Sequence, residues 1–154
     1  MSLPLRVLSN LIRPRIQHLI LHVTDRCNLR CKHCFVDLTQ RHTLSVEDAH
    51  RVAGTMGNLL WLDIGGGEPF LLKELPELIA PFDCDVLGIP TNGHDPDGIA
   101  RRVTAILETA RAKEIVISVS IEGFREEHNS IRVNPRSFDR AFESLRILRG
   151  IADE

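Results

Sequence analysis

Apolar stretches of strand length alternate with stretches whose apolar residues recur at helical spacing, and this alternation occurs four times along the chain. Apolar strands joined by helical crossovers favour a parallel sheet covered by helices, and repeated crossovers of one hand curl such a sheet toward a barrel. A closed barrel of eight βα units needs about 250 residues, whereas this chain has 154. We therefore predict an α/β fold, a partial parallel βα barrel with about four βα units. The predicted strands are 18–24, 59–64, 86–90 and 115–121.

Helix signals lie between and after these strands. Ser45 begins a capping-box pattern ahead of one apolar stripe, and Asp95 begins a second helix with proline at its first position. We expect a shorter helix at 71–80, and a last helix that begins near Ser137 and ends at Gly150. The predicted buried residues of that last helix are Phe138, Phe142, Leu145 and Leu148.

The composition predicts one globular domain, because a chain that is 43% hydrophobic with a net charge of −2 can bury enough apolar surface to fold. We expect residues 1–17 to form a lead-in with a short amphipathic helix, and 18–154 to form the core domain, which stops after its fourth βα unit. The longest run without an acidic or basic residue, 52–62, is shorter than the roughly 20 residues of a membrane span. The near-zero charge lacks the basic field typical of nucleic-acid binding. We therefore expect neither a membrane nor a nucleic acid as a partner.

Three of the four cysteines, Cys27, Cys31 and Cys34, fall within eight residues with the spacing CxxxCxxC. Such a group is typical of a metal or cofactor site in a reducing compartment, which predicts a cytoplasmic protein. Three thiolates on one loop can bind three irons of a cubane cluster and leave the fourth iron open. The alternative is a structural zinc site with His22 or His33 as the fourth ligand, although structural zinc favours paired CxxC spacings.

Polar and glycine-rich segments accompany the other predicted strands. Segment 65–69 follows the second strand, 91–93 follows the third, and Ser118, Ser120 and Glu122 lie in or just after the fourth. Active sites of parallel βα barrels are built at the carboxyl ends of the strands. We therefore expect these segments and the cysteine loop to meet at one edge of the sheet.

Each supporting segment also has a purely structural reading. Segment 65–67 would serve as an ordinary turn, and 91–93 as a plain loop, since Asn-Gly is a strong turn pair. Arg132 would be a solvated loop residue, and Cys84 a small residue near a strand start. Six scattered histidines are interpreted as surface or capping residues: His18, His22, His42, His50, His94 and His128.

Four sequence strings carry a family resemblance. T-D-R-C-N-L-R-C-K-H-C at 24–34 resembles the signature of the radical S-adenosylmethionine (radical SAM) enzymes, and G-G-E-P at 66–69 resembles their motif after strand two. T-N-G at 91–93 and S-V-S-I-E-G-F-R-E-E-H-N-S-I-R at 118–132, followed by N-P-R-S-F-D-R-A, are similar to one branch of the family. That branch includes molybdenum-cofactor biosynthesis protein A and the SPASM-type peptide-modifying enzymes. The resemblance extends over about 18–150.

The resemblance implies two cofactors and their ligands. Cys27, Cys31 and Cys34 would hold a [4Fe-4S] cluster whose free iron is chelated by S-adenosylmethionine. His33 would lie beside the adenine, and Ser120 would contact the carboxylate or ribose. Glu122 stands where the family more often has Asp. The full set of implied cofactor-binding residues is His33, Gly66, Gly67, Glu68, Asn92, Ser120, Glu122 and Arg132.

The function implied by the resemblance is reductive cleavage of S-adenosylmethionine to a 5′-deoxyadenosyl radical, which abstracts hydrogen from a peptide or cofactor-precursor substrate. No catalytic side chain beyond the cluster and cofactor is expected. The implied partners are an external one-electron donor of flavodoxin or ferredoxin type, a small-molecule or peptide substrate, and a second chain that would complete the barrel. Two alternatives stay open: a non-catalytic cluster- or cofactor-binding fragment that needs a partner chain, and a zinc-stabilised structural domain.

Overall fold

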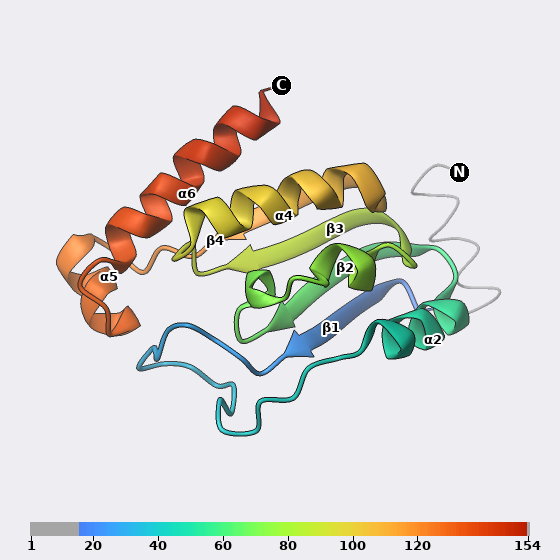
Figure 1. Cartoon of the computed structure of the whole chain (residues 1–154), viewed down its shortest axis with the longest axis horizontal. Helices are drawn as coiled ribbons and strands as arrows, with labels where there is room; N and C mark the ends of the chain where they lie inside the picture. Colours follow the sequence, from blue (N-terminus) through green and yellow to red (C-terminus); the bar gives the residue numbers. More distant parts are fainter. Residues whose placement is uncertain (1–15, 154) are drawn as a thin grey trace.

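The computed structural model describes residues 16–153 and contains a four-stranded parallel sheet in the order β1-β2-β3-β4 (Figure 1). Each strand pairs with the next along the chain, which confirms the prediction of an α/β fold with a partial parallel βα barrel. The predicted lead-in helix falls largely in residues 1–15, outside the described residues. The strands are β1 (His18–Thr24), β2 (Leu59–Gly66), β3 (Asp83–Thr91) and β4 (Arg111–Val119). The helices are α2 (Val46–Met56), α3 (Leu75–Ile79), α4 (Pro96–Thr109), α5 (Arg125–Arg132) and α6 (Ser137–Ala152), with a 3₁₀ turn η1 (Pro69–Leu71).

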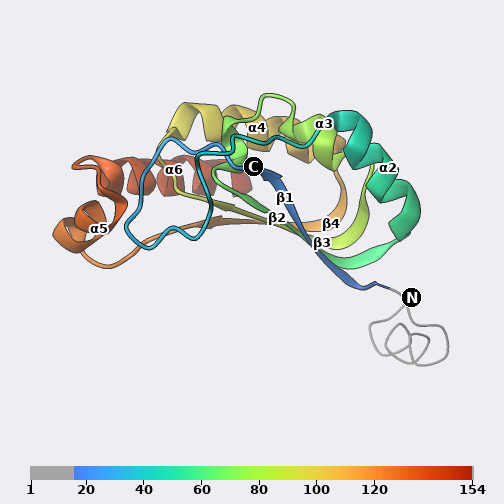
Figure 2. The ribbon, with the colours of Figure 1, turned by 90° about the horizontal axis from the view of Figure 1, so that it is seen from below.

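One face of the sheet forms the hydrophobic core. The strand register places Leu19, Leu62, Leu87 and Ile115 in one cross-strand row. Helices α2, α3, α4 and α6 all lie on one side of the sheet (Figure 2), and the core residues Leu62 and Leu87 are fully buried. The apolar row therefore explains why this face is covered.

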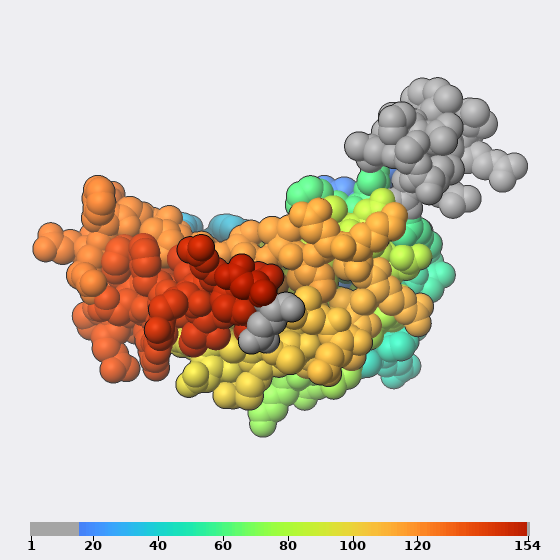
Figure 3. Space-filling view, turned by 90° about the horizontal axis from the view of Figure 1, so that it is seen from above, coloured from blue at the N-terminus to red at the C-terminus, as the bar shows by residue number. Residues whose placement is uncertain are grey.

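The opposite face of the sheet is open within the described part of the chain. Ile20 of β1 is 60% exposed and Trp61 of β2 is 43% exposed, although both belong to strands. No described helix lies over this face in Figure 2. The outer strand β4, coloured orange, also reaches the molecular surface in the space-filling view (Figure 3). The barrel is thus a half-shell with an accessible inner surface.

The predicted helix starts at Ser45 and Asp95 are confirmed. The Ser45 hydroxyl accepts a hydrogen bond from the Asp48 N–H at 3.0 Å, and the Asp95 carboxylate accepts one from the Gly98 N–H at 3.2 Å. Both caps satisfy N–H groups that have no partner inside the helix. Among the described helices, none is long and apolar enough to cross a lipid bilayer.

Several predicted elements have different bounds in the structure: β2 extends to Gly66 and β3 spans Asp83–Thr91, beyond the predicted 59–64 and 86–90. The helix expected at 71–80 is divided into η1 and the short α3, and Leu72 between them is extended. Pro76 lies in the first turn of α3, the helical position that tolerates a missing N–H. Strand β4 begins at Arg111, where it pairs with Asp83, and it ends before Ser120.

The last helix differs from the prediction in its end and in its buried face. Gly150 lies inside α6, which continues to Ala152, while Phe142 is 49% exposed and Leu145 is 38% exposed. The Ser144 hydroxyl donates to the Gly93 carbonyl oxygen at 2.8 Å. The helix thus approaches the end of β3 through small side chains rather than large ones. The buried residues of α6 are Ser137, Ala141 and Ser144.

A pair of isoleucine truncations tests which face of the sheet is the core. Ile64 in β2 is fully buried, whereas Ile20 in the neighbouring β1 lies on the open face. Ile64→Ala should lower the free energy of unfolding by about 2–5 kcal/mol, because it leaves a cavity in the core. Ile20→Ala should change it by no more than about 0.5 kcal/mol. Urea denaturation of both variants measures the difference, and equal losses would contradict the assignment of the faces.

Candidate active site

A cavity of about 460 Å³ opens at the carboxyl ends of the strands and extends over the open face of the sheet. Its lining includes residues from all four strands and from the segments that follow them. All eleven residues singled out from the sequence lie around this one cavity. They are Cys27, Cys31, His33, Cys34, Gly66, Gly67, Glu68, Asn92, Ser120, Glu122 and Arg132.

The cysteine loop leaves β1 in direct contact with the glycines at the end of β2. The Gly67 N–H donates to the Thr24 carbonyl oxygen at 2.6 Å, and the Glu68 N–H donates to the Arg26 carbonyl oxygen at 2.8 Å. Gly66 has φ of +137°, and a Cβ at that position would collide with the Thr24 backbone. A Cβ at Gly67 would collide with the Arg26 carbonyl oxygen. The two glycines therefore let the cysteine loop close against β2.

Glu68 joins the ends of β2 and β3. Its side chain is only 3% exposed, and its carboxylate accepts from the Thr91 hydroxyl at 2.9 Å, the Asn92 N–H at 2.7 Å and the Phe70 N–H at 3.2 Å. Burial raises the pKa of this carboxyl group, against the opposing effect of these hydrogen bonds. The contacts occupy the carboxylate within the chain, so Glu68 positions the segment at 91–93.

Asn92 in turn holds the first cysteine. Its amide nitrogen donates to the Asn28 side-chain oxygen at 2.8 Å and to Cys27 Sγ at 3.7 Å, and its side-chain oxygen accepts from the His94 N–H at 2.9 Å. Burial raises the pKa of the Cys27 thiol. A metal would have to displace that proton, since the thiolate is the ligand form.

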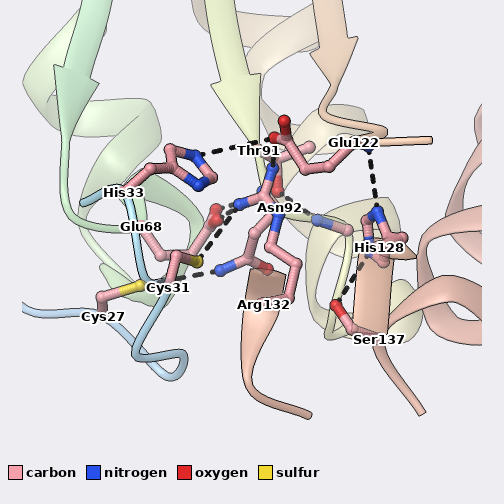
Figure 4. Close-up of polar contacts among 11 residues, drawn as sticks. Cys27, Cys31, His33, Glu68, Thr91, Asn92, Glu122, His128, Arg132 and Ser137 are labelled. Carbon is pink, nitrogen blue, oxygen red and sulfur yellow. Dashed lines mark hydrogen bonds and ion pairs between the residues drawn. The ribbon is translucent and has the colours of Figure 1, made fainter. Parts of the chain in front are cut away.

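Arg132, at the end of α5, extends its side chain into the lining of the cavity. Its guanidinium donates to the Glu122 carboxylate at 2.6 Å and to Cys31 Sγ at 3.5 Å, and its side chain is 9% exposed (Figure 4). His33 lies 3.8 Å from the same Glu122 oxygen. The Arg132 Nε is buried and has no hydrogen-bond partner within the described residues. The reading of Arg132 as a solvated loop residue is therefore wrong, because the Glu122 and Cys31 contacts draw it into the cavity.

His128 is a site residue that the sequence analysis did not identify. It is fully buried, its Nδ1 accepts from the Glu122 N–H at 3.1 Å, and its Nε2 lies 3.1 Å from the Ser137 hydroxyl. These contacts join α5, α6 and the segment that carries Glu122 (Figure 4). The expectation of a surface or capping histidine is wrong here. Helix α5 was also missed, since its sequence R-E-E-H-N-S-I-R contains a single apolar residue, Ile131, and therefore no apolar stripe.

The fourth cysteine stands apart from the site. Cys84 lies at the start of β3, which confirms the expectation of a small residue near a strand start, and it is 2% exposed. Burial, together with the smaller effect of the neighbouring Asp83 and Asp85 carboxylates, raises the pKa of its thiol to about 11. A thiol held in the protonated form is a poor metal ligand.

The donor set fits an iron–sulfur cluster with an open iron. Within residues 16–153, no three His, Cys, Asp or Glu side chains are grouped so as to hold a single ion. In a cubane cluster each thiolate binds its own iron, so the three sulfurs need not converge on one point. The spare buried N–H of Arg132 beside the cavity suits a carboxylate ligand. The residues present thus supply three thiolate ligands for a cluster and a donor for an anionic group of a second cofactor.

The sequence pattern of the Radical SAM superfamily matches residues 21–152. This chain belongs to the radical SAM superfamily. The matched range contains the cysteine loop and every other residue of the candidate site. Members of the family are enzymes that use a [4Fe-4S] cluster and S-adenosylmethionine.

Individual relatives agree with this membership. The chain is 33% identical over 132 residues to a GTP 3′,8-cyclase of Acidothermus cellulolyticus, covering 71% of this chain and 36% of the cyclase. It is 25% identical over 143 residues to the antilisterial bacteriocin subtilosin biosynthesis protein AlbA of Bacillus subtilis, covering 88% and 31%. It is 29% identical over 138 residues to an Fe-coproporphyrin III synthase of Methanosarcina barkeri, covering 80% and 32%. The chain spans about a third of the length of these relatives.

Two glycine-to-alanine variants test the closure of the cysteine loop. Gly66→Ala should lower the free energy of unfolding by about 1–3 kcal/mol, because the positive φ and the Thr24 backbone both disfavour a Cβ. Gly54→Ala is the matched control in α2, where a Cβ would contact nothing within 4 Å, and it should stabilise by about 0.5–1 kcal/mol. Thermal and urea unfolding measure the change in stability of both variants. A neutral Gly66→Ala would contradict the close approach.

The buried carboxyl of Glu68 predicts a pH effect on stability. A raised pKa means that the folded chain binds a proton where the unfolded chain has released it, so this contribution is full at low pH and is lost as the pH rises through the folded pKa. We expect the unfolding free energy of the wild type to fall, relative to that of Glu68→Gln, as the pH rises above the usual value of 4.5. Urea titrations over a pH series measure this. Glu77→Gln changes an exposed position in α3, so its unfolding free energy should depend on pH as that of the wild type does. The same pH dependence in Glu68→Gln and the wild type would refute the effect.

Proposed function

We propose that Cys27, Cys31 and Cys34 bind a [4Fe-4S] cluster and that S-adenosylmethionine binds to its open iron. The observation that carries the proposal is that the three thiols share one 460 Å³ cavity with every other residue implied by the family resemblance. The core domain in this proposal is 18–154, preceded by a lead-in at 1–17.

The chain's own residues divide into two groups in this proposal. Glu68, Asn92 and His128 position the loops, because their polar atoms are occupied by contacts within the chain. Ser120, His33 and Arg132 line the cavity and are the side chains that would contact the cofactor's carboxylate, ribose or adenine. Gly66 and Gly67 would bring backbone acceptors of their segment close to the methionine amino group.

The bound cofactors would supply the chemistry, which is one-electron reductive cleavage of S-adenosylmethionine to methionine and a 5′-deoxyadenosyl radical that would take a hydrogen atom from the substrate. The protein would orient the cofactor and keep water and competing hydrogen donors away from the radical. An external donor of flavodoxin or ferredoxin type would deliver the electron.

We infer that the substrate is a peptide or a small molecule and that the protein acts in the cytoplasm. According to their names, the relatives above are a GTP cyclase, a protein of subtilosin bacteriocin biosynthesis and an Fe-coproporphyrin III synthase. Because the chain spans about a third of their length, a further segment or a second chain would complete the barrel. No membrane or nucleic-acid partner is part of the proposal.

Cysteine variants with an internal control test the cluster site. After anaerobic reconstitution and dithionite reduction, the wild type should give a [4Fe-4S]⁺ electron paramagnetic resonance signal that changes on addition of S-adenosylmethionine. Alanine at Cys27, Cys31 or Cys34 should abolish that signal, because each thiolate binds one iron. Cys84→Ala should retain it, since Cys84 is buried away from the cavity. A signal that is insensitive to S-adenosylmethionine, or lost equally in Cys84→Ala, would refute the proposal.

A further inference from the structure

The cavity has a second end, away from the cysteines, on the open face of the sheet. Trp61 and Asp63 of β2 and Ile20 of β1 line it there. Trp61 and Asp63 precede Gly66 by five and three residues in the same strand, which places them about 16 and 10 Å from the cysteine edge at the usual rise of a strand. The same continuous cavity therefore reaches both the thiols and this second end.

Three polar side chains form a cluster at the second end. The Trp61 indole N–H donates to one oxygen of Asp63 at 2.9 Å, and His18 Nε2 lies 2.7 Å from the other oxygen. Across the sheet stands Gly88, where a Cβ would collide with the Asp63 carboxylate. The glycine leaves room for the carboxylate to lie over β3, and the two hydrogen bonds hold it there. Each carboxylate oxygen retains a free lone pair.

The Asp, Glu and Arg side chains that line the cavity are Glu68, Glu122 and Arg132 at the cysteine end and Asp63 at the second end. Arg132 is the one Lys or Arg among the described residues that line it, and two of its guanidinium nitrogens contact Glu122 and Cys31 at the cysteine end. Asp63 is the carboxylate at the second end. Trp61 is 43% exposed beside it, and Ile20, which is 60% exposed, adds an apolar surface. A carboxylate next to an accessible aromatic ring attracts cations and repels phosphates.

We propose that this second end binds an organic cation, a guanidinium or ammonium group on an apolar chain, as part of the substrate. The cation would pair with Asp63, lie against the Trp61 ring, and rest its apolar chain on Ile20. This inference rests on the proposed function and narrows its substrate class: it favours a basic side chain of a peptide, or a free amine or guanidine, over a nucleoside triphosphate such as GTP.

The single tryptophan of the chain provides the measurement, because Trp61 emission reports on this end alone. The anaerobically reconstituted chain, with excess S-adenosylmethionine present, is titrated with N-acetyl-arginine methylamide, n-butylguanidine and GTP. We expect a saturable change with the two guanidinium probes and none with GTP. N-acetyl-citrulline methylamide, the uncharged analogue of the arginine probe, should bind at least tenfold more weakly. Tighter binding of the arginine probe would indicate a cation carried by a peptide, and tighter binding of n-butylguanidine would indicate a free guanidine.

Two variants complete the test. Asp63→Asn should weaken the arginine probe at least tenfold, while Glu114→Gln, on the same face but outside the cavity lining, should leave it unchanged. Any of four results would overturn the inference. These are equal binding by wild type and Asp63→Asn, equal binding of the arginine and citrulline probes, no binding of either guanidinium probe, or saturable binding of GTP. The citrulline comparison needs no variant, so it decides the matter even where Asp63→Asn fails to fold.

The same samples separate this inference from the proposed function. A cluster signal that responds to S-adenosylmethionine, without guanidinium binding, rejects the cation site and leaves the proposed function standing. Asp63-dependent guanidinium binding without a cluster response supports the cation site and rejects the proposed function.

Discussion

The cavity depends on the hydrogen bonds made by one buried residue, Glu68. It accepts hydrogen bonds from Thr91 and Asn92 at the end of β3, while its own N–H is bonded to Arg26 in the cysteine loop. A carboxylate placed in an apolar interior is tolerated only when its oxygens have donors. The ends of three strands are thereby joined at one buried group, and Asn92 extends the connection to Cys27.

A second constraint is the division of the sheet into two faces. The row that includes Leu62 and Leu87 is covered by helices, whereas the row that includes Ile20 and Asp63 faces the cavity. Successive side chains of a strand point to opposite faces, so each strand serves stability with one set of residues and ligand contact with the other. The face that lines the cavity carries few of the contacts that hold the fold together, so its side chains are available for recognition.

Local patterns in the sequence predicted much of this architecture. Alternating apolar periods predicted the four βα units, and the capping residues Ser45 and Asp95 marked helix starts correctly, since a cap bonds within its own first turn. The buried face of α6 was predicted wrongly. Helical periodicity finds the large apolar residues, but the neighbour of α6 is the backbone at Gly93, and only small residues such as Ala141 allow that close approach.

The sequence by itself determined the family and the likeness of the cysteine loop to a cluster site, because these depend on residue types at short fixed spacings. Only the tertiary structure decided what each polar residue of the site contacts. The Arg132 guanidinium contacts Glu122 and Cys31, and the buried His128 ring lies within hydrogen-bond distance of Ser137. Such pairings join residues from 9 to 101 positions apart, so they follow from strand register and helix packing, which no local pattern encodes.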